Sequence, residues 1–163
     1  FGLGQMGGGG RLPGIGMNGK AGRLQKLASE LASHLDRWPK TERQAFEWLS
    51  DRGVNEDEAG AIVQALTQMK CLDDALYARL FIEGHRNWGP LRLSRELRGR
   101  GIADEVAREA IGELRDPEGI HEMVRDWRKA GIDDRRIAGR LIRRGFPAGE
   151  VSNALRSSCP GEE

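Results

Sequence analysis

The sequence predicts an all-α protein in which three-helix repeats form an elongated array, right-handed or solenoid-like. Leucine, alanine, arginine and glutamate are plentiful, whereas aromatic residues make up only 6% of the 163 residues, and this composition favours helices over strands. The phrase Leu-x-x-Arg-Gly-apolar also occurs three times, beginning at Leu49, Leu97 and Leu141. Repeats of this length are typical of stacked helical units. One such unit is too small to bury enough apolar surface alone, so we expect neighbouring units to share a core.

The first repeat is predicted over residues 21–70, and its first helix over residues 21–36. That helix carries leucines at helical spacing, and Pro39 follows its end. Thr41 begins a Thr-Glu-Arg-Gln capping box for a second helix that runs to Arg52. Asn55 caps the third helix, in which four residues are expected to face inward: Ala59, Ile62, Val63 and Leu66.

The second repeat is predicted over residues 71–115. Asp73 and Asp74 suit the N-terminus of its first helix, whose buried stripe is expected to be Leu76, Tyr77, Leu80 and Phe81. Asn-Trp-Gly-Pro at 87–90 separates this helix from the middle helix, predicted over residues 91–100. Asp104 opens the third helix.

The third repeat is predicted over residues 116–157. Asp116 and Pro117 are expected to start its first helix, Asp133 to cap the middle helix, and Pro147 to start the last one. Nine glycines in the first twenty residues predict a disordered tail over residues 1–20. A second disordered tail is predicted over residues 158–163.

The repeated phrase is interpreted as a helix end. Its leucine is the last buried residue of each middle helix, and its glycine adopts the left-handed conformation that stops the helix. The apolar residue after the glycine then folds back onto the helix, as in a Schellman motif. The arginine lies in the last turn, where the helix dipole favours a cation.

Charge is distributed unevenly, although the net charge is only +1. Residues 40–74 hold eight acidic and four basic residues, whereas residues 125–144 hold eight basic and three acidic ones. On both later middle helices the arginines gather on one arc, joined by basic residues of neighbouring segments. This pattern fits either an ordinary solvated face or a surface that binds phosphates or an acidic protein groove. The candidate binding residues are Arg86, Arg92, Arg95, Arg98, Arg128, Arg136, Arg140 and Arg143.

Other classes of protein are disfavoured. The three histidines and two cysteines have no metal-ligand spacing, and no catalytic triad can be assembled, so neither an enzyme nor a cofactor is expected. No apolar stretch is long enough to span a membrane. Two distant cysteines suggest free thiols, and the chain is expected to be cytoplasmic.

Two segments carry a family resemblance. Leu-Asp-Asp-Ala-Leu-Tyr-Ala at 72–78, followed by Asn-Trp-Gly-Pro-Leu-Arg-Leu-Ser-Arg-Glu-Leu-Arg-Gly-Arg-Gly-Ile at 87–102, resembles the RecX family of regulators of the RecA recombinase. The resemblance covers residues 40–157 and implies a curved, elongated monomer. It further implies binding to the RecA filament on single-stranded DNA and inhibition of RecA's ATPase, strand-exchange and coprotease activities. That role would modulate DNA repair and the SOS response, and weak direct DNA binding is compatible with it.

Two alternatives remain open at the level of sequence. Three helices with a short turn also suit a helix-turn-helix-like module that binds nucleic acid alone. The basic helices lack the asparagine or glutamine side chains that usually read adenine, which weakens this alternative. A purely helical scaffold for a protein partner is the other alternative, and it predicts no effect of DNA.

Overall fold

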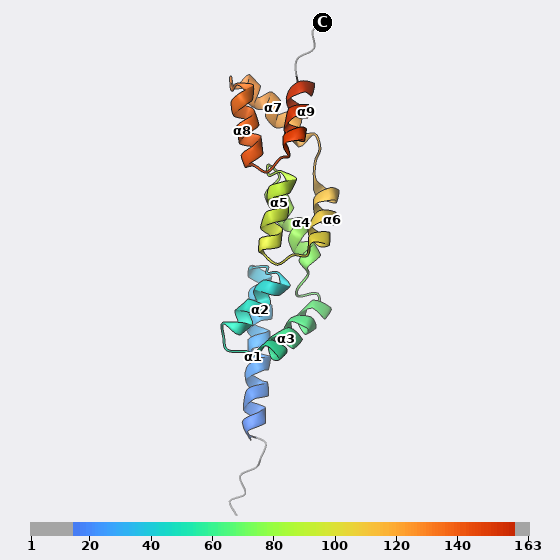
Figure 1. Ribbon diagram of the computed structural model, residues 1–163. Coiled ribbons are helices and arrows are strands. Elements are labelled where there is room, and N and C mark those ends of the chain that lie inside the picture. The colour runs from blue at the N-terminus through green and yellow to red at the C-terminus, as the bar shows by residue number, and fades with distance from the viewer. Residues whose placement is uncertain (1–14, 159–163) are drawn as a thin grey trace, which may run out of the picture.

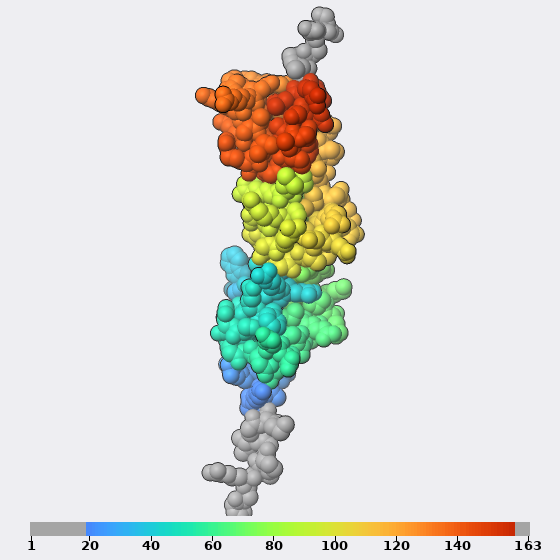
Figure 2. Space-filling view, in the orientation of Figure 1, coloured from blue at the N-terminus to red at the C-terminus, as the bar shows by residue number. Residues whose placement is uncertain are grey.

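The computed structural model describes residues 15–158 and confirms an all-α repeat fold. Within that part of the chain nine helices stack as three units along one long axis, with the N-terminal unit at the bottom of Figure 1. Figure 2 shows the elongated shape that results. Unit 1 contains α1 (Ile15–Arg37), α2 (Glu42–Ser50) and α3 (Glu56–Gln68). Unit 2 contains α4 (Asp74–Gly84), α5 (Pro90–Gly99) and α6 (Asp104–Leu114), and unit 3 contains α7 (Gly119–Lys129), α8 (Asp134–Arg143) and α9 (Ala148–Ser157).

Each unit has a hydrophobic core of its own. The three clusters of buried side chains in the described residues centre on Leu31 and Leu49, on Leu93 and Leu97, and on Ile137 and Leu141. Each cluster draws its residues from a single unit, except for Leu72, which comes from the linker after α3 and packs in the core of unit 1, so the expectation of a shared core is wrong. The reason lies in the helix ends, which fold an apolar side chain back into the core of the same unit.

The repeated phrase forms a Schellman motif in all three units, as expected. Gly53, Gly101 and Gly145 have φ values of 79°, 87° and 93°. The N–H of the following apolar residue donates to the carbonyl of the phrase's leucine at 3.1–3.2 Å each time. Those apolar residues are at most 6% exposed: Val54, Ile102 and Phe146.

The predicted caps also form. Thr41 and Gln44 make a complete capping box at α2, and the side chains of Asn55, Asp73 and Asp133 accept backbone N–H groups at the starts of α3, α4 and α8.

Several expected boundaries differ from the structure. α1 begins at Ile15, inside the predicted tail, and Lys20 forms an ion pair with Glu58 of α3 at 2.6 Å. This tertiary contact favours a helical segment that its glycines alone disfavour. α7 begins at Gly119, because Asp116 caps a turn by accepting the N–H of Glu118.

At the other end of the chain, Ser158 is the C-cap of α9 rather than part of a tail. The predicted tail segments 1–14 and 159–163 lie outside the described residues.

The buried stripe of α4 differs in part from the prediction: Tyr77 and Phe81 pack against the core of unit 2 as expected, but Leu76 and Leu80 do not. Ala78 and Ile82 face the core, at 0% and 3% exposure, whereas Leu76 and Leu80 are 52% and 49% exposed. Leucine is the more apolar choice in a sequence pattern, but α6 packs so closely on α4 that alanine fits between the helices. Two leucines of α4 are therefore left on the surface.

The middle helices of successive units meet end to end. At joint 1–2 the hydroxyl of Thr41, at the start of α2, donates to the carbonyl of Arg100, at the end of α5, at 2.6 Å. At joint 2–3 the N–H of Gly89, before α5, donates to the carbonyl of Arg144, after α8, at 2.7 Å. The positive N-terminus of each helix thus faces the negative C-terminus of the next, and unpaired carbonyls there gain donors.

α3 ends in the same motif with a different residue. Lys70 occupies the left-handed position, with a φ of 61°. Among the described residues, it is the one residue other than glycine that has a positive φ. The equivalent positions after α2, α5, α7 and α8 are glycines. A side chain in this conformation costs about 1–2 kcal/mol, so the structure holds a lysine where glycine would be less strained.

Candidate partner-binding surfaces

An exposed arginine groove runs along α8. It is lined by Asp133, Arg135, Arg136, Gly139, Arg140 and Arg143. The Nε of Arg136 lies 3.4 Å from Asp133, yet its side chain remains 78% exposed. Arg143 forms no ion pair among the described residues. A Cβ added at Gly139 would lie 3.6 Å from a guanidinium nitrogen of Arg143, so this glycine lets a cation lie close to the helix backbone in the groove.

Arg135 belongs to this groove although the sequence analysis did not select it. The other arginines recur three and four positions apart, which marks one helical face. Arg135 lies 100° from Arg136 around the helix. It nevertheless lines the groove, together with Gly139 one turn further along α8.

On α5 two of the predicted arginines are exposed. Arg95 forms no ion pair within the described part of the chain, and the Nε of Arg98 donates to Asp104 at 2.8 Å while its side chain stays 66% exposed. Glu96 accepts a hydrogen bond from Arg100 at 2.9 Å, and this bond, followed by the charges of nearby arginines, lowers the pKa of Glu96. The arginines of α5 thus remain in excess over its one carboxylate.

Arg92 does not join this surface. Its guanidinium carbon lies 3.7 Å from the ring centroid of Trp88, a cation–π contact, and its backbone packs against Gly145. The Nε of Arg92 is buried and has no hydrogen-bond partner among the described residues. Arg92 therefore supports joint 2–3, and we exclude it from the binding surface.

Arg128 also does not join the exposed arginine surface, because it is hydrogen-bonded within unit 3. It donates two hydrogen bonds to Asp134 at 2.8 Å each and one to the carbonyl of Leu155 at 2.8 Å, and its side chain is 20% exposed. These bonds tie α7 to the other helices of unit 3. The hydrogen bond from Arg128 lowers the pKa of Asp134.

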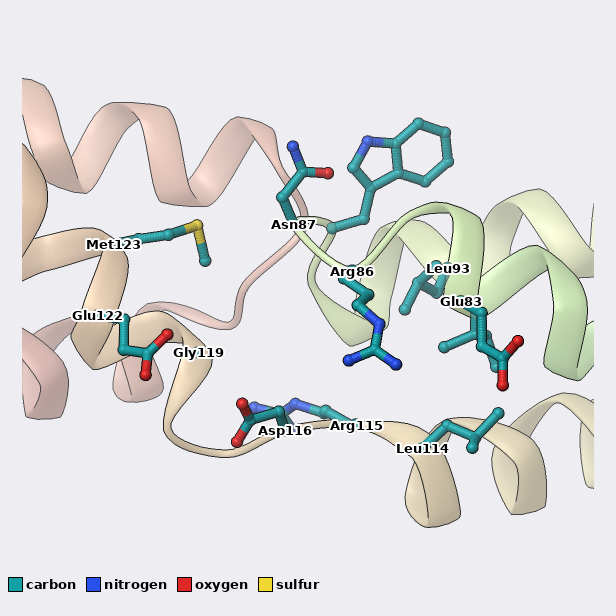
Figure 3. A pocket seen from close by; sticks show the side chains of 12 residues that line it. Glu83, Arg86, Asn87, Leu93, Leu114, Arg115, Asp116, Gly119, Glu122 and Met123 are labelled. Atoms are coloured by element: carbon teal, nitrogen blue, oxygen red, sulfur yellow. The ribbon is translucent and has the colours of Figure 1, made fainter.

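Arg86 faces a cavity instead of the arginine surface. The cavity has a volume of about 290 Å³ and lies between units 2 and 3 (Figure 3). In Figure 3 the guanidinium group of Arg86 points toward the segment of Arg115 and Asp116. Two further carboxylates, Glu83 and Glu122, line the same cavity. The eight predicted arginines thus divide into five surface residues and three at other places.

No helix among residues 15–158 combines the length and apolar character that crossing a membrane requires. In the same residues, no cluster of three or more histidine, cysteine or acidic side chains is placed to hold a metal ion.

Comparison with known proteins gives a consistent relationship. A family model described as RecX, second three-helix domain, matches residues 73–111, which form α4, α5 and most of α6. The regulatory protein RecX of Halorhodospira halophila is 33% identical over 154 residues, covering 88% of this chain and 96% of that protein. The chain belongs to the RecX family. The RecX of Thermus thermophilus is 38% identical over 103 residues, covering 62% of this chain and 70% of that protein.

Some RecX relatives are much longer. The regulatory protein RecX of Lactobacillus gasseri is 30% identical over 110 residues, which span 65% of this chain but only 41% of that protein. The chain therefore spans less than half the length of this curated relative.

Solved structures show the same fold. A crystal structure of RecX from Lactobacillus salivarius superposes with a TM-score of 0.75 at 18% identity, covering 85% of this chain and 97% of that one. A second RecX crystal structure gives a TM-score of 0.72 at 20% identity. The three-helix units are thus a property of the RecX fold.

Proposed function

We propose that this RecX-family chain binds the RecA filament on single-stranded DNA and inhibits RecA's ATPase, recombinase and coprotease activities. Through this inhibition it would modulate DNA repair and the SOS response. The observation that carries the proposal is the run of exposed arginines on two middle helices that stack end to end, in a chain of this family. The surface consists of Arg95, Arg98, Arg136, Arg140 and Arg143.

The arrangement suits a long, anionic target better than a small ligand. α5 and α8 meet at joint 2–3 and follow one another along the long axis of the molecule (Figure 1). The exposed arginines of these two helices are therefore spread along that axis. Exposed guanidinium groups bind phosphates or carboxylates and lose hydrated counterions when they do so. A line of such groups fits a filament that presents the same anionic groups repeatedly.

Inhibition needs no chemistry from this chain. A rigid array that contacts successive RecA protomers would bind one state of the filament better than others. The filament would then be held in that state, and the conformational cycle that accompanies ATP hydrolysis would slow. Differential affinity for filament states is sufficient for this effect.

The test reverses three charges of the α8 groove. We expect the triple variant Arg136→Glu, Arg140→Glu, Arg143→Glu to inhibit the ATPase of RecA on single-stranded DNA at least tenfold more weakly. Helical content, measured by circular dichroism, should stay unchanged, because these side chains are exposed.

A matched control reverses three exposed arginines elsewhere and changes the net charge equally: Arg79, Arg108 and Arg156. This control should inhibit as the unaltered chain does. Equal inhibition by the α8 variant and the unaltered chain would remove the α8 groove from the proposal. Tight binding of the chain to bare DNA, equal to its binding to RecA filaments, would instead favour a stand-alone nucleic-acid module.

A further inference from the structure

A groove recurs at both unit boundaries. At the first boundary it is bounded by the end of α1, the linker after α3 and the start of α4. The cavity at the second boundary is bounded by the corresponding segments: the end of α4, the linker after α6 and the start of α7 (Figure 3). The two are therefore equivalent places in the repeat, and we call them groove 1–2 and groove 2–3.

The two grooves differ in chemistry. Leu76, Tyr77 and Leu80 line groove 1–2, together with Lys40 and Lys70 at its rim. The buried residues Ile82 of α4 and Val124 of α7 occupy equivalent positions in their units. Leu80 and Glu122 each lie two residues before them, so groove 2–3 has a glutamate where groove 1–2 has Leu80. Groove 2–3 also contains two other carboxylates, and its basic residues are Arg86 and Arg115. Both grooves have apolar side chains in their walls, but only groove 1–2 combines them with two lysines and a single carboxylate.

Part of the apolar wall of groove 1–2 is open to solvent. Leu76 and Leu80 line the groove and are 52% and 49% exposed. Two large apolar side chains on successive turns of α4 are thus left uncovered by the described residues. Exposed apolar groups that gather in this way mark interaction sites.

The charges around this groove select an acidic occupant. Neither Lys40 nor Lys70 forms an ion pair among the described residues. The one carboxylate in the lining, Asp73, already accepts the N–H of Leu76 as the cap of α4. The strained left-handed conformation of Lys70 holds a cation at the rim where four equivalent helix ends have glycine.

We propose that groove 1–2 is a docking site for a segment of a partner protein in which large apolar side chains alternate with carboxylates. The apolar side chains pack on Leu76, Tyr77 and Leu80, and the carboxylates pair with Lys40 and Lys70. This site is separate from the arginine surface of α5 and α8, and it does not depend on the proposed action on RecA. It gives the array a second, protein-specific contact beside a phosphate-binding one.

The test uses defined peptides and the whole chain, without RecA or DNA. Three fluorescent twelve-residue peptides carry leucine and phenylalanine at the same four positions and aspartate, lysine or serine at the others. In fluorescence anisotropy the aspartate peptide should bind at least tenfold more tightly than the other two. Equal binding of all three peptides, or no binding of the aspartate peptide, would overturn the proposal.

Variants place the binding in the groove. The double variant Leu76→Ser, Leu80→Ser should weaken binding of the aspartate peptide at least tenfold, and Lys40→Glu with Lys70→Glu should do the same. The matched control is Leu91→Ser on α5, a leucine that is 59% exposed outside this groove, and it should bind as the unaltered chain does. Equal weakening by the control would show non-specific apolar binding and overturn the proposal.

Cys71 supplies an independent readout. Its thiol is exposed and lines groove 1–2. In a Cys159→Ser variant, saturating aspartate peptide should slow alkylation of Cys71 by N-ethylmaleimide at least fivefold. An unchanged alkylation rate under saturating peptide would place the peptide elsewhere and reject the groove. Since RecA is absent from these experiments, their outcome does not depend on the outcome of the inhibition assay.

Discussion

Joint 1–2 and joint 2–3 connect the same helix ends through different atoms. Joint 1–2 is made by a side chain, the hydroxyl of Thr41, which reaches the carbonyl of Arg100. The hydrogen bonds of joint 2–3 are made by backbone groups, with the N–H groups of Gly89 and Leu91 donating to the carbonyls of Arg144 and Gly145 at 2.7 and 3.0 Å. Thr41 and Gly89 are both the N-cap residues of their helices. Because a backbone N–H replaces a side-chain hydroxyl as the donor at joint 2–3, the two backbones approach each other more closely there than at joint 1–2.

This difference shows which parts of the repeat are constrained. End-to-end stacking of middle helices is kept at both joints, although the residues that achieve it differ. The grooves beside the joints keep their position and an apolar wall, but their charged residues change from two lysines and one carboxylate to two arginines and three carboxylates. The joint is therefore set by the geometry of the array, and the groove is open to specialisation for a partner.

The largest expected effect is on joint 2–3. A Cβ added at Gly89 would lie 2.3 Å from the carbonyl carbon of Gly145, and its φ of −78° is one that any residue adopts. Gly89→Ala should therefore lower the free energy of unfolding by about 3 kcal/mol, through overpacking alone. Urea denaturation, followed by circular dichroism, measures this change in the free energy of unfolding.

The control for this change is Gly60→Ala, in the interior of α3, where an added Cβ meets nothing within 4 Å. It should raise stability by about 0.5–1 kcal/mol. A Gly89→Ala protein as stable as the unaltered chain would show that joint 2–3 is wider than described.

A smaller effect is expected at joint 1–2. Thr41 is completely buried, and its hydroxyl both accepts the N–H of Gln44 and donates to Arg100. Thr41→Val removes both bonds while keeping the shape, and should cost about 1–2 kcal/mol. Thr41→Ser keeps the hydroxyl and should recover most of the loss in the same urea titration. Equal losses in both variants would assign the effect to packing instead of the joint.

Removing the backbone strain at Lys70 should raise the free energy of unfolding, whereas the changes at the two joints lower it. Lys70→Gly removes the cost of a left-handed lysine, partly offset by the greater freedom of glycine in the unfolded chain. The free energy of unfolding should rise by about 0.5–1 kcal/mol, while the affinity for the aspartate peptide falls. Thermal unfolding measures the change in stability, and fluorescence anisotropy of the same sample measures the affinity for the peptide. A variant with unchanged stability and unchanged affinity would contradict the role assigned to Lys70.

The smallest expected effect concerns Asp74, beside joint 1–2. Burial raises the pKa of its carboxyl group from 3.8, although the N–H of Glu42 donates to it at 2.9 Å. Because the folded pKa is the higher one, this group's contribution to stability is present below the unfolded pKa and is lost as pH rises through the folded pKa. Asp74→Asn keeps an acceptor without a charge. Its stability relative to the unaltered chain should rise with pH over that range and then level off, as measured by urea denaturation between pH 3 and 7.

Much of the fold could be predicted because it depends on local patterns. The Schellman phrases, the caps at Thr41, Asn55 and Asp133, and the helical composition each act over a few neighbouring residues. The stripe of α4 could be predicted only in part in this way, since Tyr77 and Phe81 pack against the core but Leu76 and Leu80 do not. Which face of that helix is buried depends on how closely α6 approaches, and Ala78 fills that space better than Leu76 or Leu80.

The arginines show the same limit. Sequence identified the basic helices, and five of the eight predicted residues lie on the exposed surface of α5 and α8. It could not separate these from Arg92, which stacks on Trp88, or from Arg128, which binds Asp134 and Leu155. That these predicted residues bind RecA or DNA remains a prediction.

The sequence by itself determined that this protein is a series of three-helix units, because helix stops and caps are encoded within a few residues of one another. Only the tertiary structure decided that each unit closes its own core, that the middle helices meet end to end, and that the two boundary grooves differ. Those features arise from contacts between segments far apart in the chain. A local pattern carries no information about which distant residues will meet it.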